Sequence, residues 1–505
     1  MSVLFKGVTV VALDDEHGTE PFSADVRVEG DRIVAVGMDD APADSVVDGR
    51  DRLLMPGLVN AHLHSWEALF KGRYENLPLE LWMLLAYPIL ALEPLGARLI
   101  ELRSQLVAIE SLRNGVTTLV DDVIEMPTQS MEALEAVFHG YAATGVRACV
   151  SGNIVNRPYI DTIPYVDEVL PAELLAEARA RKPLSTEDYL AFSEEALRRF
   201  HDPDGLLRYF LAPSGPQRCT DELLVACDEL ARRHDLGTHI HVLETKVQAV
   251  TGREFYGCTL VERLHDLGVL GPHTAIAHGI WLTASDIKTL AERETSVVHN
   301  PISNQKLGAG IAPWRELLDA GVNVALGTDG LCSNDSARMF DVVKSAALLH
   351  SVSEPDYTRW PTANEVLWSA TRAGARSATL EDEVGSIEVG KRADLVLLDL
   401  NSINFVPRND LRKHLVYCEN GASILEVYVG GQRVVAEDKC ELVDEQAVLA
   451  EFRELAEEAL ARHAGIEKLN EVFQPYFHEI HRRCCQEDIG LNRYSREPQA
   501  WLGRV

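Results

Sequence analysis

The sequence predicts an α/β protein: a (β/α)8 TIM barrel with a small β-sandwich domain built from both termini and a helical C-terminal extension. Three observations lead to this fold class. Strand-like apolar runs alternate with amphipathic helical segments in residues 57–384, β-rich segments flank that region on both sides, and the tail has helical periodicity. With 505 residues the chain is too long for one compact core, so more than one structural unit is expected.

The β-sandwich domain is expected to comprise residues 1–56 and 385–440. The first part contains the runs FKGVTVVAL, ADVRVEGDRIVAVG and RLLMPG, and the second contains GSIEVGKRADLVLLDL and ILEVYVGGQRVVAEDK. These are short strand-like runs separated by turns. Because the two parts stand on either side of the barrel region, we expect them to join in one domain.

The catalytic barrel is expected over residues 57–384, where eight candidate strands occur. In order they read LVNAHLH, TTLVDD, RACVSGN, LLRYFLAP, GTHIHVLE, TAIAHGIW, TSVVHNP and NVALGTDG. Amphipathic segments such as TDELLVACDELARRHD lie between them. Repeated alternation of strand and helix predicts a parallel sheet covered by helices, and eight strands fit a closed barrel.

Residues 441–505 are expected to form the helical extension. Its apolar residues recur at steps of three and four: Val448, Leu449, Phe452, Leu455, Ala456 and Leu460. The last stretch of the chain is rich in aromatic residues, unlike a disordered tail. We therefore expect it to pack over the barrel or at a subunit contact.

Composition limits the partners and the compartment. The formal net charge of −30 argues against nucleic acid and anionic membranes as partners. We find neither an apolar run that would span a bilayer nor an N-terminal secretion signal. The nine cysteines are scattered and form no CxxC pair, which is typical of a reduced protein. A cytoplasmic enzyme acting on a small molecule is expected.

Polar side chains fall at the C-terminal ends of the predicted strands, where barrel active sites are built. The first strand ends in His62 and His64, whose i, i+2 spacing points both rings to one side. Later strands deliver further candidates: His239, His241, Glu244, His278 and Asp329. A single buried histidine is more commonly a core residue. Together, however, neutral imidazoles and one carboxylate are the ligands that Zn²⁺ prefers, so the set predicts a metal centre.

Five segments resemble the amidohydrolase superfamily: PGLVNAHLH, HVLET, AHGIW, HNPISNQKLGAGIAPWRELLDAGVNVALGTDG and VGKRADLVLLDL. The resemblance is to the branch with triazine hydrolases and the methylthioadenosine/S-adenosylhomocysteine, guanine and cytosine deaminases, and it extends to about residue 440. It implies four metal ligands: His62, His64, His241 and Asp329. The superfamily's H-x-x-E pattern pairs His241 with Glu244 and leaves His239 as a neighbour or core residue.

The resemblance implies a hydrolase of non-peptide C–N bonds that acts on an amidine-, guanidine- or N-heterocycle-type substrate and releases ammonia or an amine. Zn²⁺, or alternatively Fe²⁺, lowers the pKa of a bound water to roughly 7. Asp329 would accept the proton of that water, Glu244 would protonate the substrate nitrogen, and His278 would hold the water or the developing oxyanion. Binuclear relatives commonly carry a lysine on the fourth strand, which here ends FLAPSGPQR, so one metal ion is expected.

Six residues are candidates for substrate contact: Glu67, Trp66, Asp122, Ser214, Asn300 and Asn304. Glu67, with Asp122, would pair with an amidinium or guanidinium group; alternatively Glu67 pairs with Lys71 or Arg73 on its own helical turn. Trp66 would stack on a planar substrate or simply pack. Both asparagines would donate to the substrate or serve as turn residues. Ser214 stands where many nucleoside-acting relatives carry a histidine, which argues against an adenosine-type substrate.

Two alternative functions are left open. A triazine-type enzyme would release halide or alkylthio groups, although Glu244 argues against halide, which needs little protonation. A metal-free scaffold protein on the same fold would be expected to have lost its ligands, whereas this chain keeps all four. The superfamily habit and the aromatic tail predict a homodimer or a larger homo-oligomer.

Overall fold

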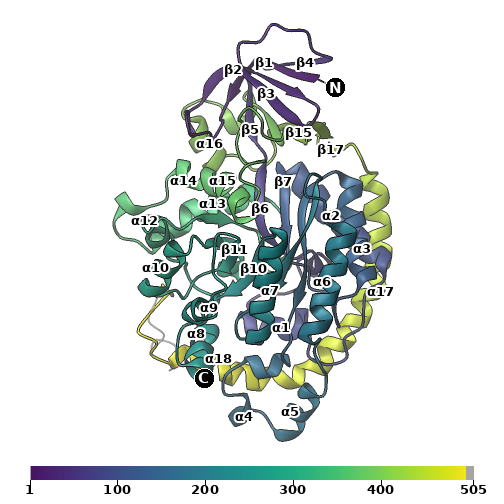
Figure 1. Cartoon of the computed structure of the whole chain (residues 1–505), viewed down its shortest axis with the longest axis vertical. Coiled ribbons are helices and arrows are strands. Elements are labelled where there is room, and N and C mark those ends of the chain that lie inside the picture. The colour runs from purple at the N-terminus through teal and green to yellow at the C-terminus, as the bar shows by residue number, and fades with distance from the viewer. Residues whose placement is uncertain (1, 496–505) are drawn as a thin grey trace.

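The computed structural model describes residues 2–495 and shows a central barrel with a sheet at one end and a long C-terminal helix along its side (Figure 1). The barrel sheet consists of eight strands: β6 (Leu58–Leu63), β7 (Val116–Asp121), β8 (Arg147–Ile154), β9 (Leu207–Pro213), β10 (Thr238–Val242), β11 (Thr274–His278), β12 (Ser296–His299) and β13 (Val324–Leu326). All neighbouring pairs are parallel, and each strand matches one of the eight predicted runs.

The barrel is nearly closed between its first and last strands. The amide of Asp329, just after β13, donates to the carbonyl of His62 in β6 at 2.9 Å. The side chain of Asn60 in β6 donates to the hydroxyl of Thr328 at 2.7 Å and accepts from its amide at 2.9 Å. These contacts bring the end of β13 against β6, and so place residues from both ends of the barrel region side by side.

The α-helices surround the barrel; α1 to α12 lie between consecutive barrel strands, and α13 to α18 follow the last barrel strand, β13. They are α1 (Leu79–Ala86), α2 (Ala97–Arg113), α3 (Met131–Thr144), α4 (Val166–Val169), α5 (Ala172–Arg179), α6 (Thr186–Phe200), α7 (Asp221–His234), α8 (Lys246–Tyr256), α9 (Leu260–Asp266), α10 (Ala284–Glu292), α11 (Pro301–Lys306), α12 (Trp314–Asp319), α13 (Met339–Leu349), α14 (Ala363–Ser369), α15 (Arg372–Ser377), α16 (Leu411–Tyr417), α17 (Glu445–Asn470) and α18 (Gln474–Gln486). Short 3₁₀ helices add η1 (Ser65–Phe70), η2 (Tyr159–Thr162), η3 (His350–Val352), η4 (Tyr357–Arg359), η5 (Ile403–Phe405) and η6 (Glu471–Phe473).

The two termini build one mixed sheet of nine strands outside the barrel. It contains β1 (Ser2–Val10), β2 (Phe22–Glu29), β3 (Arg32–Gly37), β4 (Ser45–Asp48), β5 (Arg52–Pro56), β14 (Leu395–Asp399), β15 (Ile424–Val429), β16 (Gln432–Ala436) and β17 (Lys439–Cys440). The N- and C-terminal parts join where β5 and β14 pair antiparallel, as expected from the sequence. Residues such as Phe5, Val28 and Leu397 form a separate buried core within this sheet.

The C-terminal extension lies along the barrel in its described part. Helix α17 packs against α2, and α18 packs against α1 and α8. Helix α18 contributes His481, whose Nδ1 lies 3.4 Å from the carboxylate of Glu80 on α1, so the tail contacts a helix near the barrel mouth. Residues 496–505, the end of the predicted aromatic stretch, lie outside the described residues. Between residues 2 and 495 we find no helix with the length and apolarity needed to cross a membrane.

Candidate metal centre

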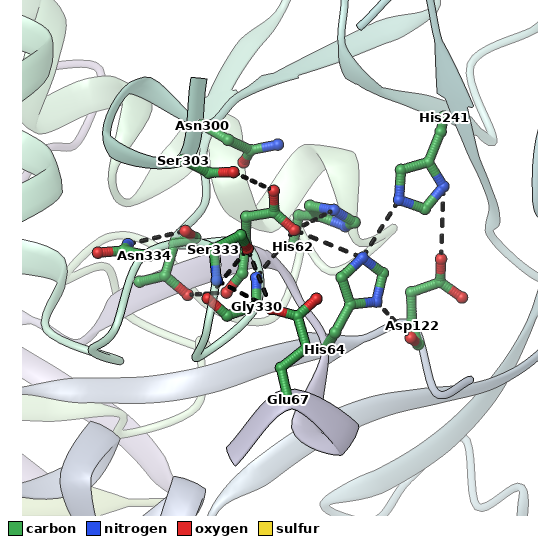
Figure 2. Close-up of polar contacts among 12 residues, drawn as sticks. His62, His64, Glu67, Asp122, His241, Asn300, Ser303, Gly330, Ser333 and Asn334 are labelled. Carbon is green, nitrogen blue, oxygen red and sulfur yellow. Dashed lines mark hydrogen bonds and ion pairs between the residues drawn. The ribbon is translucent and has the colours of Figure 1, made fainter. Parts of the chain in front are cut away.

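The four predicted metal ligands meet at one end of the barrel, and all are buried. Nε2 of His62 lies 3.3 Å and Nε2 of His64 lies 3.4 Å from the same carboxylate oxygen, Oδ1 of Asp329. Nε2 of His241 lies 3.2 Å from Nε2 of His64. Figure 2 shows the rings of these histidines turned toward one another. Strand ends that are far apart in the sequence therefore present their ring nitrogens and one carboxylate to a common point.

Hydrogen bonds on the other ring nitrogens determine which nitrogen atoms are free. Nδ1 of His64 lies 2.7 Å from the carbonyl of Asp122, and Nδ1 of His241 lies 3.0 Å from the carbonyl of Ser214. A carbonyl can only accept, so both Nδ1 atoms carry hydrogen and, in neutral rings, both Nε2 atoms present a lone pair. Two lone pairs that face each other at 3.2 Å repel unless a positive charge lies beside them. This arrangement fits a divalent metal ion.

The pKa values indicate the same demand for positive charge. Burial lowers the pKa of His62 to about 4 and holds that of His241 well below its usual range. Both rings are therefore neutral and can offer a lone pair to a metal ion. Burial also opposes the charged form of His64, but nearby carboxylates, Asp329 first among them, outweigh it and raise the pKa of His64 to about 9. The cluster therefore favours a positive charge at its centre. A metal ion bound by neutral imidazoles would provide that charge.

His239 lies directly behind the first ligand. Its Nε2 is 2.8 Å from Nδ1 of His62, on the side of the ring away from Asp329. Nε2 of His62 has no hydrogen-bond partner among the residues that the structure describes. His239 thus supports the orientation of a ligand, in keeping with its expected place as a neighbour, and leaves the Nε2 of His62 free to bind a metal.

His278 and Glu244 lie beside the ligands. Nε2 of His278 is 3.8 Å from Oε1 of Glu244 and 3.9 Å from Oδ2 of Asp329. Nδ1 of His278 lies 3.0 Å from the side-chain oxygen of Asn304, so it carries the hydrogen and Nε2 faces the two carboxylates. Gln248 donates to Oε2 of Glu244 at 3.2 Å, and burial raises the pKa of Glu244. A protonated Glu244 next to a fixed imidazole is suited to donating a proton.

Two of these residues have an unusual backbone conformation. His278 has φ = 73° and Asp329 has φ = 63°, in the left-handed region that residues other than glycine rarely adopt. His278 is the last residue of β11, and Asp329 lies three residues after the end of β13. Residues held in sparsely populated conformations cluster at functional sites, where the surrounding structure compensates for the strain. The backbone therefore turns these two side chains toward the cluster.

Two cavities adjoin the cluster. A small one of about 30 Å³ is lined by ligand residues together with Leu79 and Trp82, and a larger one of about 450 Å³ extends away from it. Four residues belong to the walls of both: Met83, Tyr87, Ile124 and Arg218. The larger cavity therefore begins where the metal centre ends, which gives a substrate space beyond the reacting group.

Glu67 contacts the protein chain with both carboxylate oxygens. Oε2 accepts from the amides of Cys332 and Ser333 at 3.1 and 3.0 Å, and Oε1 accepts from the hydroxyl of Tyr87 at 3.0 Å. In Figure 2, Glu67 points up from its helix toward the loop that contains Ser333. The alternative pairing on its own helical turn is wrong, because Lys71 pairs with Glu110 and Arg73 pairs with Glu467. Its contact with a cationic substrate stays a prediction.

Two of the other expected substrate contacts are directed elsewhere. Trp66 is buried, donates to the carbonyl of Ala86 at 3.3 Å and is absent from the walls of both cavities. The prediction that it stacks on a substrate is therefore wrong. Trp82 lines the small cavity instead. The carboxylate of Asp122 accepts from Ser151 and Asn153 and lies 3.7 Å from Nδ1 of His241. Asp122 therefore supports two metal ligands, one through its carbonyl and one through its carboxylate, rather than the substrate.

Neither asparagine lines one of these two cavities; both lie beside His278, and Asn304 accepts the hydrogen bond that holds its ring. Nδ2 of Asn300 lies 3.4 Å, and Oδ1 of Asn304 lies 3.0 Å, from Nδ1 of His278. Ser214 does line the larger cavity, but its carbonyl also holds His241, a role that the sequence reasoning missed. Also missed were residues that hydrogen-bond the acids or form the cavity junction: Tyr87, Gln248 and Arg218. Of these, only Arg218 carried a signal, as a charged residue just after the fourth strand.

Comparisons with known proteins give the family. The sequence model of the Amidohydrolase family matches residues 53–434. The 5'-deoxyadenosine deaminase of Methanosarcina acetivorans is 34% identical over 91% of this chain and 99% of its own length. The 5-methylthioadenosine/S-adenosylhomocysteine deaminase of Caldanaerobacter subterraneus subsp. tengcongensis is 35% identical over 90% of this chain and 98% of its own length.

Solved structures agree with these relatives. An adenosine deaminase from Xanthomonas campestris with bound zinc has a TM-score of 0.79 and 30% identity, covering 90% of this chain and 98% of its own. An atrazine chlorohydrolase from Arthrobacter aurescens TC1 complexed with zinc has a TM-score of 0.80 and 25% identity, covering 90% and 100%. The described barrel and its histidine cluster thus have zinc-binding counterparts. This chain belongs to the amidohydrolase family.

Proposed function

We propose that this chain is a metal-dependent aminohydrolase that removes an amino group from an N-heterocycle and releases ammonia. The observation that supports this most directly is the convergence of His62, His64, His241 and Asp329 beside a buried acid. The relatives named for adenosine-type deamination favour a purine nucleoside among the predicted substrate classes. Ser214 argues against an adenosine-type substrate at one position only, whereas several relatives are named for such substrates. The larger cavity of about 450 Å³ offers space for a ring substituent.

The donor set fits zinc, held by His62, His64, His241 and Asp329. When bound, the metal supplies an activated water as the nucleophile. The residues of this chain would do the rest. Asp329, whose Oδ2 accepts from Ser303 at 2.6 Å, is fixed in place to take up the proton of the attacking water.

Glu244 and His278 complete the reaction: Glu244 protonates the ring, the proton on Asp329 passes to the amino group, which leaves as ammonia, and the second proton of the water restores Glu244. Burial raises the pKa of Glu244, so this carboxyl holds a proton more readily than an exposed glutamate and can give it to the ring nitrogen next to the reacting carbon. The ring of His278 is held through Nδ1 by Asn304, so that its Nε2 faces the gap between the two acids and can contact the water. The buried side chains of Leu79 and Trp82 keep bulk water away from this point.

The two alternative functions are not favoured. Release of halide or an alkylthio group does not need a buried proton donor at the position of Glu244. A metal-free scaffold does not need the four predicted ligands, which are all present and meet at one point. The homo-oligomeric state and the cytoplasmic location stay predictions from the sequence.

The test is a screen for ammonia release by the zinc-loaded protein. Adenosine, 5'-deoxyadenosine and 5'-methylthioadenosine would be compared with guanidines and aminotriazines, while bound zinc is measured in parallel. We expect ammonia from at least one nucleoside, and we expect Glu244→Gln to keep its zinc but lose about 100-fold or more in kcat. Zinc-loaded protein that releases ammonia from none of these compounds, or an undiminished Glu244→Gln variant, would contradict the proposal.

A further inference from the structure

Arg218 is a buried charge without a counter-ion. Its side chain follows β9 and the residue is 8% exposed. Nη1 donates to the hydroxyl of Ser214 at 3.2 Å, and Nη2 lies 3.8 Å from the sulfur of Met83. Within residues 2–495 it forms no ion pair with a carboxylate. A guanidinium stays protonated in proteins, so this charge is permanent.

This isolation sets Arg218 apart from the other buried arginines. Five arginines are buried in the described part of the chain, and the other four each pair with a carboxylate: Arg27 with Asp39, Arg103 with Glu125, Arg147 with Asp394, and Arg392 with Glu383. Buried charges are normally paired, because removing them from water without compensation is costly. A partner from outside the protein would supply the compensation that Arg218 lacks.

The position of Arg218 indicates which part of a bound molecule would contact it. The residue belongs to the walls of both cavities, so its guanidinium stands where the metal centre opens into the larger space. A molecule whose reacting group lies among the metal ligands would place its substituent beside Arg218.

The wall of the larger cavity carries further positive charge. Arg157, Arg181 and Lys182 line it, and none of them is ion-paired within the described part of the chain. Of its two acidic residues, Glu125 is neutralised by Arg103, and Asp188 accepts from the hydroxyl of Ser185 at 2.8 Å. A cationic wall is unexpected in a chain of net charge −30, and it favours an anion in this cavity.

We propose that Arg218 binds a carboxylate carried by the substrate while the amino group of the ring lies at the metal centre. The inference rests on the proposed function and narrows its substrate to N-heterocycles with an anionic substituent. A carboxylate is favoured over phosphate because one guanidinium fork matches its two oxygens and its single charge. The chain would then select its substrate by charge at the junction of the two cavities.

The experiment uses two probes of the same shape, adenosine 5'-carboxylate and adenosine 5'-carboxamide, which differ in charge. Binding to the zinc-loaded protein is measured by calorimetry, and ammonia release is measured separately. We expect the carboxylate to bind about 10- to 100-fold more tightly than the carboxamide, the value of a charge-assisted hydrogen bond. Arg218→Met should bring this ratio close to one by weakening the binding of the carboxylate far more than that of the carboxamide, and Arg218→Lys should keep part of the ratio.

Arg233→Met is the matched control, because it removes one positive charge from an exposed position that pairs only loosely with Glu194, at 3.8 Å. It should keep the full ratio. Equal binding of both probes, binding of neither, or an unchanged ratio in Arg218→Met and Arg218→Lys overturns the proposal. Tighter binding of adenosine 5'-phosphate than of the carboxylate overturns the choice of carboxylate. A clear binding ratio without ammonia release would contradict the proposed function alone, and ammonia release without the ratio would contradict the anion site alone.

Discussion

Replacing Glu67 separates two roles for this buried carboxylate: binding a cationic substrate and holding the loop that follows Asp329. Five donors contact it, namely the amides of Cys332 and Ser333, the thiol of Cys332 and the hydroxyls of Ser333 and Tyr87, at 3.0 to 3.2 Å. The loop begins at Gly330, whose Cα packs against the carboxylate so closely that a Cβ would overlap it. We therefore expect Glu67 to act mainly on the position of this loop.

The size of the effect follows from these contacts. Glu67→Ala leaves buried donors without an acceptor and is expected to destabilise the protein by about 3–5 kcal/mol. In Glu67→Gln the amide oxygen can replace Oε2, and the amide nitrogen can face the hydroxyl of Tyr87, which rotates to accept. Only the charge-assisted part of the hydrogen bonds is lost, about 1–2 kcal/mol.

Chemical denaturation of the zinc-loaded protein measures the stability, and kcat/KM is measured for one cationic and one neutral substrate. If Glu67 holds the loop, Glu67→Gln lowers kcat/KM by the same factor for both substrates, and the loss of stability accompanies it. A loss confined to the cationic substrate, in a variant as stable as the wild type, would refute this reasoning and support direct contact with the substrate.

Three further predictions concern the metal, a buried ion pair and the tail. Asp329→Asn removes the carboxylate among the four predicted ligands. It should lower the zinc content, measured by atomic absorption, and should lower the activity by at least about 100-fold. Arg103→Met leaves its buried glutamate partner without a counter-ion and should cost about 3–5 kcal/mol in denaturant unfolding. Burial opposes the charge of His481, but hydrogen bonds with Cys485 and Glu80 outweigh it and raise its pKa from 6.5 to about 10. His481 should therefore stabilise the fold fully below about pH 6.5, and the melting-temperature gap to His481→Asn should close as the pH rises to about 10.

Different results would contradict each of the three. Asp329→Asn protein with full zinc content would exclude a ligand role for that carboxylate. An Arg103→Met variant as stable as the wild type would mean that the ion pair contributes little beyond the cost of burying it. A melting-temperature gap that widens with rising pH would reverse the assigned direction of the His481 pKa.

The amino-acid sequence determined the barrel and the end of it at which the candidate metal ligands gather, because both depend on local pattern. Apolar runs that alternate with amphipathic segments specify strands and helices through their period, and all eight predicted strands are present. The i, i+2 spacing of His62 and His64 directs both rings to one face, and the C-terminal ends of parallel strands meet at one end of a barrel. Convergence of the ligands therefore follows from the fold class and needs no knowledge of side-chain packing.

Only the tertiary structure decided what each remaining side chain contacts. Ser214 holds His241 through a backbone carbonyl, which every residue type possesses and which leaves no mark in the sequence. Trp66 turns away from the cavity and Glu67 turns toward the loop after Asp329, although both belong to the same 3₁₀ helix. A sequence likewise shows that Arg218 is charged, but not that its guanidinium forms no ion pair with a carboxylate among residues 2–495. Such contacts join residues that are distant in the chain, and packing around them selects one direction for each side chain among several that the local backbone allows.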